Sequence, residues 1–267
     1  MFVLFLNDYY KHTIMNIKKS YIYLSIALSF LGISACSESD KHTGFLDDSQ
    51  ELLVGLTEVD GYDHTYNYDF NILKEREKVE FYIPTSLSEG LNRIPSEMRS
   101  KINLISSTDL PFIVANNQSN IVTSWNNYNK LVFQIQISYL ENDLGYDTNF
   151  KDFFIVSITQ CPDNPFEKMD EEALKTLNDD LELRKYEFLN LKEDLTLYYL
   201  PKSNDNSWPR MFDYYNYNES EKRMYKESTG SYQYYAWYNG LIFKIGCNMD
   251  MDAVDPEPLV RKIILGN

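Results

Sequence analysis

The dipeptide Asn239-Gly240 constrains the fold more than any other feature, because strand-like runs rich in apolar and aromatic residues flank it on both sides. Asn-Gly favours a two-residue type I′ turn, in which both central residues take a positive φ. Such a turn fixes the register of a hairpin and predicts that one face is apolar and buried. That face carries Tyr232, Tyr234, Ala236, Tyr238, Leu241, Phe243, Ile245 and Cys247. The opposite face is mixed and includes Tyr235 and Trp237.

Other segments also have the two-residue period of a half-buried strand. Residues 131–139 alternate apolar and mostly polar side chains, and residues 153–159 form a second apolar run after a polar stretch. We expect these two strands to be antiparallel neighbours. Weaker strand patterns occupy residues 52–59, 66–73, 79–83, 121–125, 195–200 and 211–217.

Helical patterns are fewer. Residues 167–190 place apolar side chains at helical spacing opposite a charged face, which predicts a helix packed across a sheet. A shorter helical segment covers residues 86–105 and is broken at Pro95. The chain closes with a helix that has Asp255 as its N-cap and Pro256 at its first position. We therefore predict an α+β fold, with a largely antiparallel sheet, a packed helix at about residues 167–190 and a C-terminal hairpin–helix unit.

The N-terminal region has the order of a secretory signal. Lys18 and Lys19 precede an uncharged stretch at residues 20–31, which small residues and Cys36 follow. The apolar core is shorter than the roughly 20 residues that cross a bilayer. We expect a cleaved signal over residues 1–35, with Met15 as the true start.

Ile33-Ser34-Ala35-Cys36 resembles the lipobox of bacterial lipoprotein precursors. The resemblance implies a diacylglyceryl group on Cys36, cleavage before it and acylation of the new amino terminus, with palmitate as a typical chain. It also implies a lipid anchor in the cell envelope, and Ser37 favours the outer membrane if the host has two membranes. The alternative is an ordinary cleaved signal in which Cys36 is incidental. In the lipoprotein interpretation, residues 36–50 form the lipidated N-terminus and a flexible tether. Residues 51–267 form a single globular domain.

The C-terminal segments 238–245 and 258–264 resemble the last third of uncharacterised domains found in other exported bacterial lipoproteins. This second resemblance covers the hairpin and the closing helix. It implies no catalytic residues.

The charge of the mature chain limits its partners. Residues 1–35 hold three of the 25 basic and one of the 40 acidic residues, so 22 basic and 39 acidic residues remain and the net charge is −17. Such a surface repels nucleic acid and favours a basic protein partner. The simpler alternative is that the charge only keeps the protein soluble.

Two cysteines remain once Cys36 is assigned to lipid. Cys161 and Cys247 are predicted either to form one disulfide in an oxidising envelope or to be two buried thiols. Neither is expected to be a catalytic nucleophile, because the mature chain has only His42 and His64 as histidines.

Motifs of catalysis and of metal or cofactor binding are absent from the sequence, so we predict no catalytic residue, no metal site and no cofactor. Two acidic clusters could supply oxygen ligands to calcium, but we interpret them as solvated turns. One comprises Asp60, Asp63 and Asp69, and the other comprises Asp250, Asp252, Asp255 and Glu257.

These features favour a non-enzymatic binding or protein-interaction lipoprotein of the cell envelope. Tyr235 and Trp237 are its candidate binding surface, and cross-strand packing is the alternative role for both side chains. One version is an immunity-type lipoprotein that neutralises a basic toxin. The alternative function, from a different class, is an envelope hydrolase that acts on peptidoglycan or glycan through paired carboxylates.

Overall fold

The structure is a computed structural model, and it describes residues 48–62, 77–125, 130–141, 152–164, 187–192, 195–201, 211–249 and 254–266. The chain divides into two compact units, Met1–Phe45 and Leu46–Asn267, and all described residues belong to the second.

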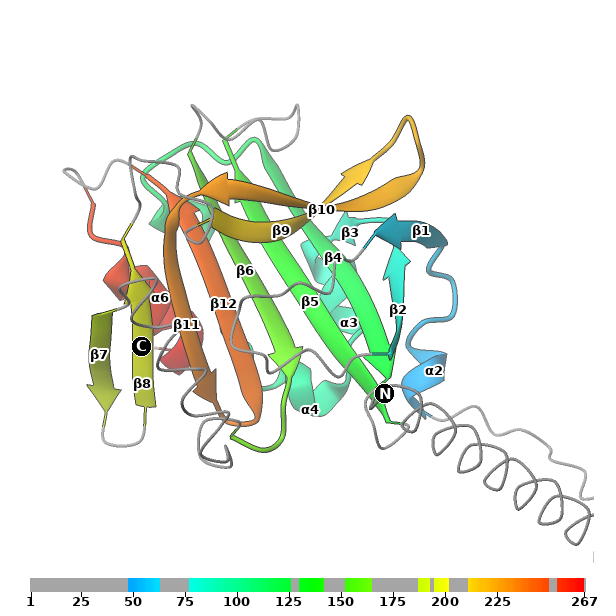
Figure 1. Cartoon of the computed structure of the whole chain (residues 1–267), viewed down its shortest axis with the longest axis horizontal. Coiled ribbons are helices and arrows are strands. Elements are labelled where there is room, and N and C mark those ends of the chain that lie inside the picture. The colour runs from blue at the N-terminus through cyan, green and yellow to red at the C-terminus, as the bar shows by residue number, and fades with distance from the viewer. Residues whose placement is uncertain are drawn as a thin grey trace, which may run out of the picture. The chain divides into compact units, whose positions relative to one another are not determined.

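A large, mostly antiparallel sheet dominates the described part of the chain (Figure 1). Its strands are β1 (Glu58–Tyr62), β2 (Glu77–Tyr82), β3 (Thr85–Ser86), β4 (Asn116–Trp125), β5 (Leu131–Leu140), β6 (Phe153–Gln160), β7 (Glu187–Lys192), β8 (Leu195–Leu200), β9 (Met211–Asn218), β10 (Arg223–Gly230), β11 (Tyr232–Tyr238) and β12 (Leu241–Asn248). The order is β7-β8-β11-β12-β6-β5-β4-β2-β1-β10-β9, with β3 beside β4. The pairing of β1 with β10 is parallel, which makes the sheet mixed.

Short helices cover one face of this sheet, which we call the back face. They are α2 (Asp48–Glu51), α3 (Leu87–Asn92), α4 (Ser96–Arg99), the 3₁₀ helix η1 (Ser107–Asp109) and α6 (Glu257–Leu265). Figure 1 shows α3, α4 and α6 behind the central strands. The main core lies between these helices and the sheet, and its large, fully buried members include Phe133, Phe154, Phe243, Ile94 and Met98.

The predicted hairpin is confirmed. Asn239 and Gly240 have φ values of 52° and 80°, as a type I′ turn requires. Strands β11 and β12 pair in the predicted register, from Tyr238 opposite Leu241 to Tyr232 opposite Cys247. The closing helix is confirmed, but it starts one residue later than predicted, with Pro256 as its N-cap and Glu257 as its first residue. The Asp255 carboxylate accepts a hydrogen bond from the Glu257 N–H at 2.9 Å. Its predicted apolar stripe is buried in the core: Leu259, Val260, Ile263 and Ile264.

Several other predictions hold within the described residues. Strands β5 and β6 are antiparallel neighbours, and β8 has the predicted bounds. The helical segment at residues 86–105 is broken at Pro95, which separates α3 from α4. The sheet is larger, and the helical content lower, than the phrase α+β suggests.

Some predictions differ from the structure. The predicted helix at residues 167–190 is wrong at its end, because residues 187–190 belong to β7, which pairs with β8. Its remaining part, and the predicted strand at residues 66–73, lie outside the described residues. Of the predicted strand at residues 52–59, only the last two residues are in a strand. Strand β10 was not predicted, because its sequence Arg-Met-Tyr-Lys-Glu-Ser-Thr-Gly has no apolar alternation.

Strands β9 and β10 cross the face of the sheet opposite the helices, which we call the front face (Figure 1). Two smaller core clusters lie here. One packs Phe212 and Tyr214 against Leu140, Phe153 and Ile155. The other joins Tyr215 and Met224 to Phe81 and Val122. No helix among the described residues is long and apolar enough to cross a membrane.

Candidate functional site

The central strands turn an unusually polar surface toward the front face. Its buried polar side chains are Asn120, Gln134, Gln136, Ser138, Ser157, Thr159 and Gln233. The register places them on one side, because Gln136 is opposite both Asn120 on β4 and Ser157 on β6. Buried polar groups of this kind require hydrogen-bond partners, so this layer demands a specific cover.

Strand β9 supplies part of that cover through its main chain. The Tyr215 N–H donates to Gln136 Oε1 at 2.8 Å, and Gln136 Nε2–H donates to the Tyr215 carbonyl at 2.8 Å. Asn120 Nδ2–H donates to the same carbonyl at 3.1 Å. The Gln136 amide therefore pairs with the Tyr215 peptide groups as a neighbouring strand would.

Aromatic rings fix the same contact from both sides. Phe212 lies over Gly246 of β12, where a Cβ atom would be 2.5 Å from the ring. Tyr215 meets Phe81 edge to face, with 5.4 Å between ring centroids. Only a residue without a side chain fits beneath Phe212, so Gly246 permits β9 to approach the sheet.

One cation lies among these rings. Lys244 Nζ is 5.2 Å from the Phe212 centroid and 5.8 Å from the Tyr235 centroid. Both distances are within the range of a cation–π contact. The half-buried Lys244 thus contributes to packing at the junction of β9, β11 and β12.

The candidate binding pair, Tyr235 and Trp237, lies beside this junction. Tyr235 is 2% exposed, and its hydroxyl donates to Gln233 Oε1 at 3.2 Å. The expectation that Tyr235 is exposed is wrong, because the front face of the hairpin is covered. Trp237 is half-buried, and its indole N–H donates to the Cys161 carbonyl at 2.7 Å. A binding role for Trp237 stays a prediction.

The proposed disulfide between Cys161 and Cys247 is wrong, because the two cysteines are not bonded to each other and lie near opposite ends of β12. Cys161 lies beside the start of β12, because its N–H donates to the carbonyl of Gly240, the residue before that strand. Cys247 lies near the end of β12, opposite Phe154. At about 3.4 Å per residue, Leu241 and Cys247 are about 20 Å apart, and a disulfide needs Cα atoms within about 7 Å. Burial, followed by the charge of Asp163, raises the pKa of the Cys161 thiol to about 11. Cys161 is therefore a weak nucleophile at neutral pH.

The remaining predicted site residues are placed only in part. Cys36 lies outside the described residues, as do Asp63, Asp69, Asp250 and Asp252 of the acidic clusters. Asp60 forms an ion pair with Arg223 at 3.6 Å, and Asp255 accepts a hydrogen bond from the Glu257 N–H at the start of α6. In the part of the chain that the structure describes, no three His, Cys, Asp or Glu side chains gather as metal ligands.

Two carboxylates on the sheet accept hydrogen bonds from neutral donors. Glu80 Oε2 accepts from the Tyr82 hydroxyl at 3.0 Å and from Thr123 at 3.2 Å. Burial is the main cause that raises the pKa of Tyr82 to about 12, so this phenol stays protonated at neutral pH. Glu227 accepts from the Tyr214 hydroxyl at 3.0 Å and from Asn216 at 2.9 Å.

A hollow of about 250 Å³ lies where α2 meets the corner between α3 and α4. Its lining comprises Ser49, Leu52, Asn92, Ile94, Pro95, Ser96 and Arg99. Arg99 Nη1–H donates to Asn92 Oδ1 at 2.9 Å across the corner. The lining holds one full positive charge and no carboxylate.

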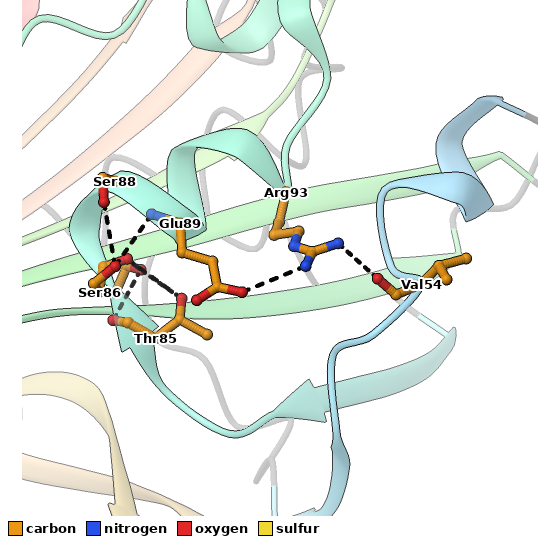
Figure 2. Close-up of polar contacts among 7 residues, drawn as sticks. Val54, Thr85, Ser86, Ser88, Glu89 and Arg93 are labelled. Atoms are coloured by element: carbon orange, nitrogen blue, oxygen red, sulfur yellow. Dashed lines mark hydrogen bonds and ion pairs between the residues drawn. The ribbon is translucent and has the colours of Figure 1, made fainter.

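A second arginine holds the wall of this hollow in place. Figure 2 shows Arg93 reaching from α3 to the carbonyl of Val54, a contact of 2.6 Å, while its other amino group meets Glu89 at 3.4 Å. The Ser86 hydroxyl caps the start of α3 by accepting from the Glu89 N–H. Arg93 thereby ties the segment after α2 to α3.

The sequence interpretation did not single out Gln136 or Arg99. Gln136 was counted among the polar residues of its strand, and no local pattern signals that another strand covers it. The break at Pro95 predicts a corner between two helices near Arg99. The hollow also needs α2 beside that corner, and this contact between segments far apart in the chain has no local signal in the sequence.

Comparisons with known proteins give no relative. No family model, no curated protein and no solved structure matches this chain.

Replacement of Gly246 by Ala tests how β9 sits on the sheet. The added methyl group meets the Phe212 ring, so we expect a loss of about 1–3 kcal/mol in the free energy of unfolding. Urea unfolding of Gly246→Ala, Phe212→Ala and the double variant measures the coupling. In the Phe212→Ala background the methyl group should cost little. An equal cost with and without the ring would contradict this packing.

Proposed function

We propose that this chain is a non-enzymatic binding lipoprotein of the cell envelope, anchored through a lipid on Cys36. The anchor rests on the lipobox-like residues Ile33-Ser34-Ala35-Cys36 after an uncharged segment. Two or three acyl chains give stable attachment where one does not. The partner that best fits a net charge of −17 on the mature chain, from 22 basic and 39 acidic residues, is a protein with a basic surface.

The observation that carries the binding role is a group of exposed carboxylates, which we call the acidic rim: Glu58, Asp60, Glu219 and Glu221. Strands β1 and β10 are parallel, with Asp60 opposite Arg223. Glu58 and Glu221 each lie two residues earlier, so they fall at the same end of this pair. The four carboxylates outnumber the two cations beside them, Lys222 and Arg223, and such an excess of one charge attracts a partner of opposite charge and speeds its association.

The turn that presents the rim is ordered by its own side chains. Asn218 Oδ1 accepts from the Glu221 N–H at 3.1 Å and from the Ser220 hydroxyl at 2.7 Å. Lys222 takes a positive φ of 52°, which completes the turn into β10. A fixed turn loses less conformational entropy on binding than a mobile one.

The alternative, a hydrolase with paired carboxylates, has less support. Such an enzyme needs two carboxylates that flank the scissile bond. The carboxylates of Glu80 and Glu227 each accept two hydrogen bonds from neutral side chains, which is an arrangement typical of structural carboxylates.

One version of the binding role is an immunity-type lipoprotein whose acidic rim neutralises a basic toxin of the envelope. This version rests on charge and on the proposed location. A toxin gene beside the gene of this protein would favour it over other protein partners.

Mass spectrometry of protein extracted from membranes tests the anchor. The expected N-terminal peptide begins at Cys36 and carries acyl chains, and Cys36→Ser should release the protein from the membrane fraction. A mature protein that starts elsewhere with an unmodified Cys36 would contradict the proposal.

Charge reversal tests the acidic rim. The double variant Glu58→Lys, Glu219→Lys should reduce capture of the partner, measured by quantitative cross-linking in the envelope, by about tenfold at low salt. The matched control is Glu51→Lys, Glu187→Lys, which changes two exposed carboxylates outside the rim by the same charge. Equal loss in both variants would mean that only net charge matters and would remove the rim.

A further inference from the structure

The hollow beside Arg99 differs from its surroundings in charge. Four of its side chains carry hydrogen-bond donors: Ser49, Asn92, Ser96 and Arg99. Two acidic side chains near the lining in sequence are paired, since Glu97 meets Lys101 at 2.8 Å and Glu89 meets Arg93 at 3.4 Å. A third, Glu51, is exposed and is not part of the lining. A donor-rich hollow without a carboxylate favours an anion.

Arg99 is also exceptional among the arginines that the structure describes. The other three have carboxylate partners: Arg93 with Glu89, Arg223 with Asp60 and Arg261 with Glu257. Arg99 instead contacts the neutral Asn92. In a chain with 40 acidic and 25 basic residues, an arginine held by an amide rather than a carboxylate keeps its charge for a ligand.

The contact with Arg99 sets the polarity of Asn92. Its Oδ1 accepts from the guanidinium, so its Nδ2–H groups remain as donors. Guanidinium has five N–H donors, of which this contact uses one. The Ser96 hydroxyl adds a further donor at the start of α4.

The other walls are apolar. Ile94 is 1% exposed and belongs to the main core, and Leu52 and Pro95 complete the apolar part of the lining. A volume of about 250 Å³ holds more than an inorganic ion. The ligand therefore needs a charged head and a short apolar group.

We propose that this hollow binds a small organic phosphate ester. The phosphate lies against Arg99, Asn92 and Ser96, and the apolar group of the ester lies against Leu52, Ile94 and Pro95. A tetrahedral phosphate has more acceptor oxygens than a carboxylate and uses donors from three residues at once. The acidic charge of the whole chain does not prevent this, because exposed charges beyond about 8 Å are screened at physiological salt. This site is separate from the acidic rim and does not depend on the proposed function.

Titration of the full chain in an uncharged detergent with butyl phosphate tests the proposal. Calorimetry should detect binding of butyl phosphate and no binding of the control compounds n-butanol and butylammonium. Arg99→Gln should weaken the binding of butyl phosphate about tenfold or more, because a charged hydrogen bond is lost. Asn92→Asp should weaken it by a similar factor, because the new carboxylate forms an ion pair with the Arg99 guanidinium in place of the phosphate. Both residues are exposed, so the melting temperature should be unchanged.

Lys222→Gln is the matched control, since it removes one positive charge from an exposed side chain that is not part of the lining. Arg99→Lys, which keeps the charge without the planar fork, should bind with intermediate affinity. If Arg99→Gln lowers the melting temperature, its loss of binding could come from unfolding, and the affinities of Asn92→Asp and Arg99→Lys for butyl phosphate then test the proposal. The proposal is overturned if the unaltered protein does not bind butyl phosphate, if n-butanol binds equally well, or if Lys222→Gln weakens binding as much as Arg99→Gln.

The source of the phosphate ester is separated by competition. The full chain is inserted into nanodiscs of phosphatidylcholine with or without phosphatidic acid, and butyl phosphate is titrated into both. Weaker apparent binding in the presence of phosphatidic acid, lost in Arg99→Gln, assigns the hollow to a lipid headgroup. Equal binding in both nanodiscs assigns it to a soluble phosphate ester.

Discussion

The pairing of the Gln136 side chain with the main chain of Tyr215 is the interaction on which the front of this domain depends. Strand β9 is the last strand of the sheet, so no strand among the described residues pairs with its outer edge. Gln136 supplies both a donor and an acceptor to that edge, each at 2.8 Å. Because the pairing is buried, its loss would remove the acceptor of the Tyr215 N–H, at a cost of about 1–3 kcal/mol, whereas the Tyr215 carbonyl keeps its hydrogen bond from Asn120 at 3.1 Å.

This interaction explains why the sheet has two unlike faces. The back face is an ordinary apolar core under α3, α4 and α6. The front face keeps polar side chains such as Asn120 and Gln136 in the interior, where they hold β9 in one position. Apolar contacts alone are less directional, so Phe212 over Gly246 fills the space while the amides set the register. The acidic rim follows from this arrangement, because β9 and β10 carry the turn that presents Glu219 and Glu221.

Local patterns in the sequence predict the parts of the fold that local chemistry determines. Asn239-Gly240 fixes the register of β11 and β12, because a two-residue turn leaves no freedom to slip. Alternation predicts the strands but not what covers them, so Tyr235 was expected at the surface and is buried. The wrong disulfide has the same origin, since the separation of Cys161 and Cys247 depends on the pairing of β12 with β6. The parallel contact of β1 with β10 joins segments far apart in the chain, and no local pattern reports it. The hollow beside Arg99 likewise arises only when α2 packs against α3.

Amide hydrogen exchange at Tyr215 tests the central role of Gln136 most directly. In the unaltered protein this N–H is buried and bonded to Gln136 Oε1, so it should exchange slowly. In Gln136→Leu it should exchange much faster, while the amides of β5 and β6 stay protected. Thr159→Ala, on the same face but opposite Gln134 rather than Gln136, is the control and should leave Tyr215 protected. If Tyr215 stays equally protected in Gln136→Leu, the side-chain pairing does not hold β9, and this account of the front face is wrong.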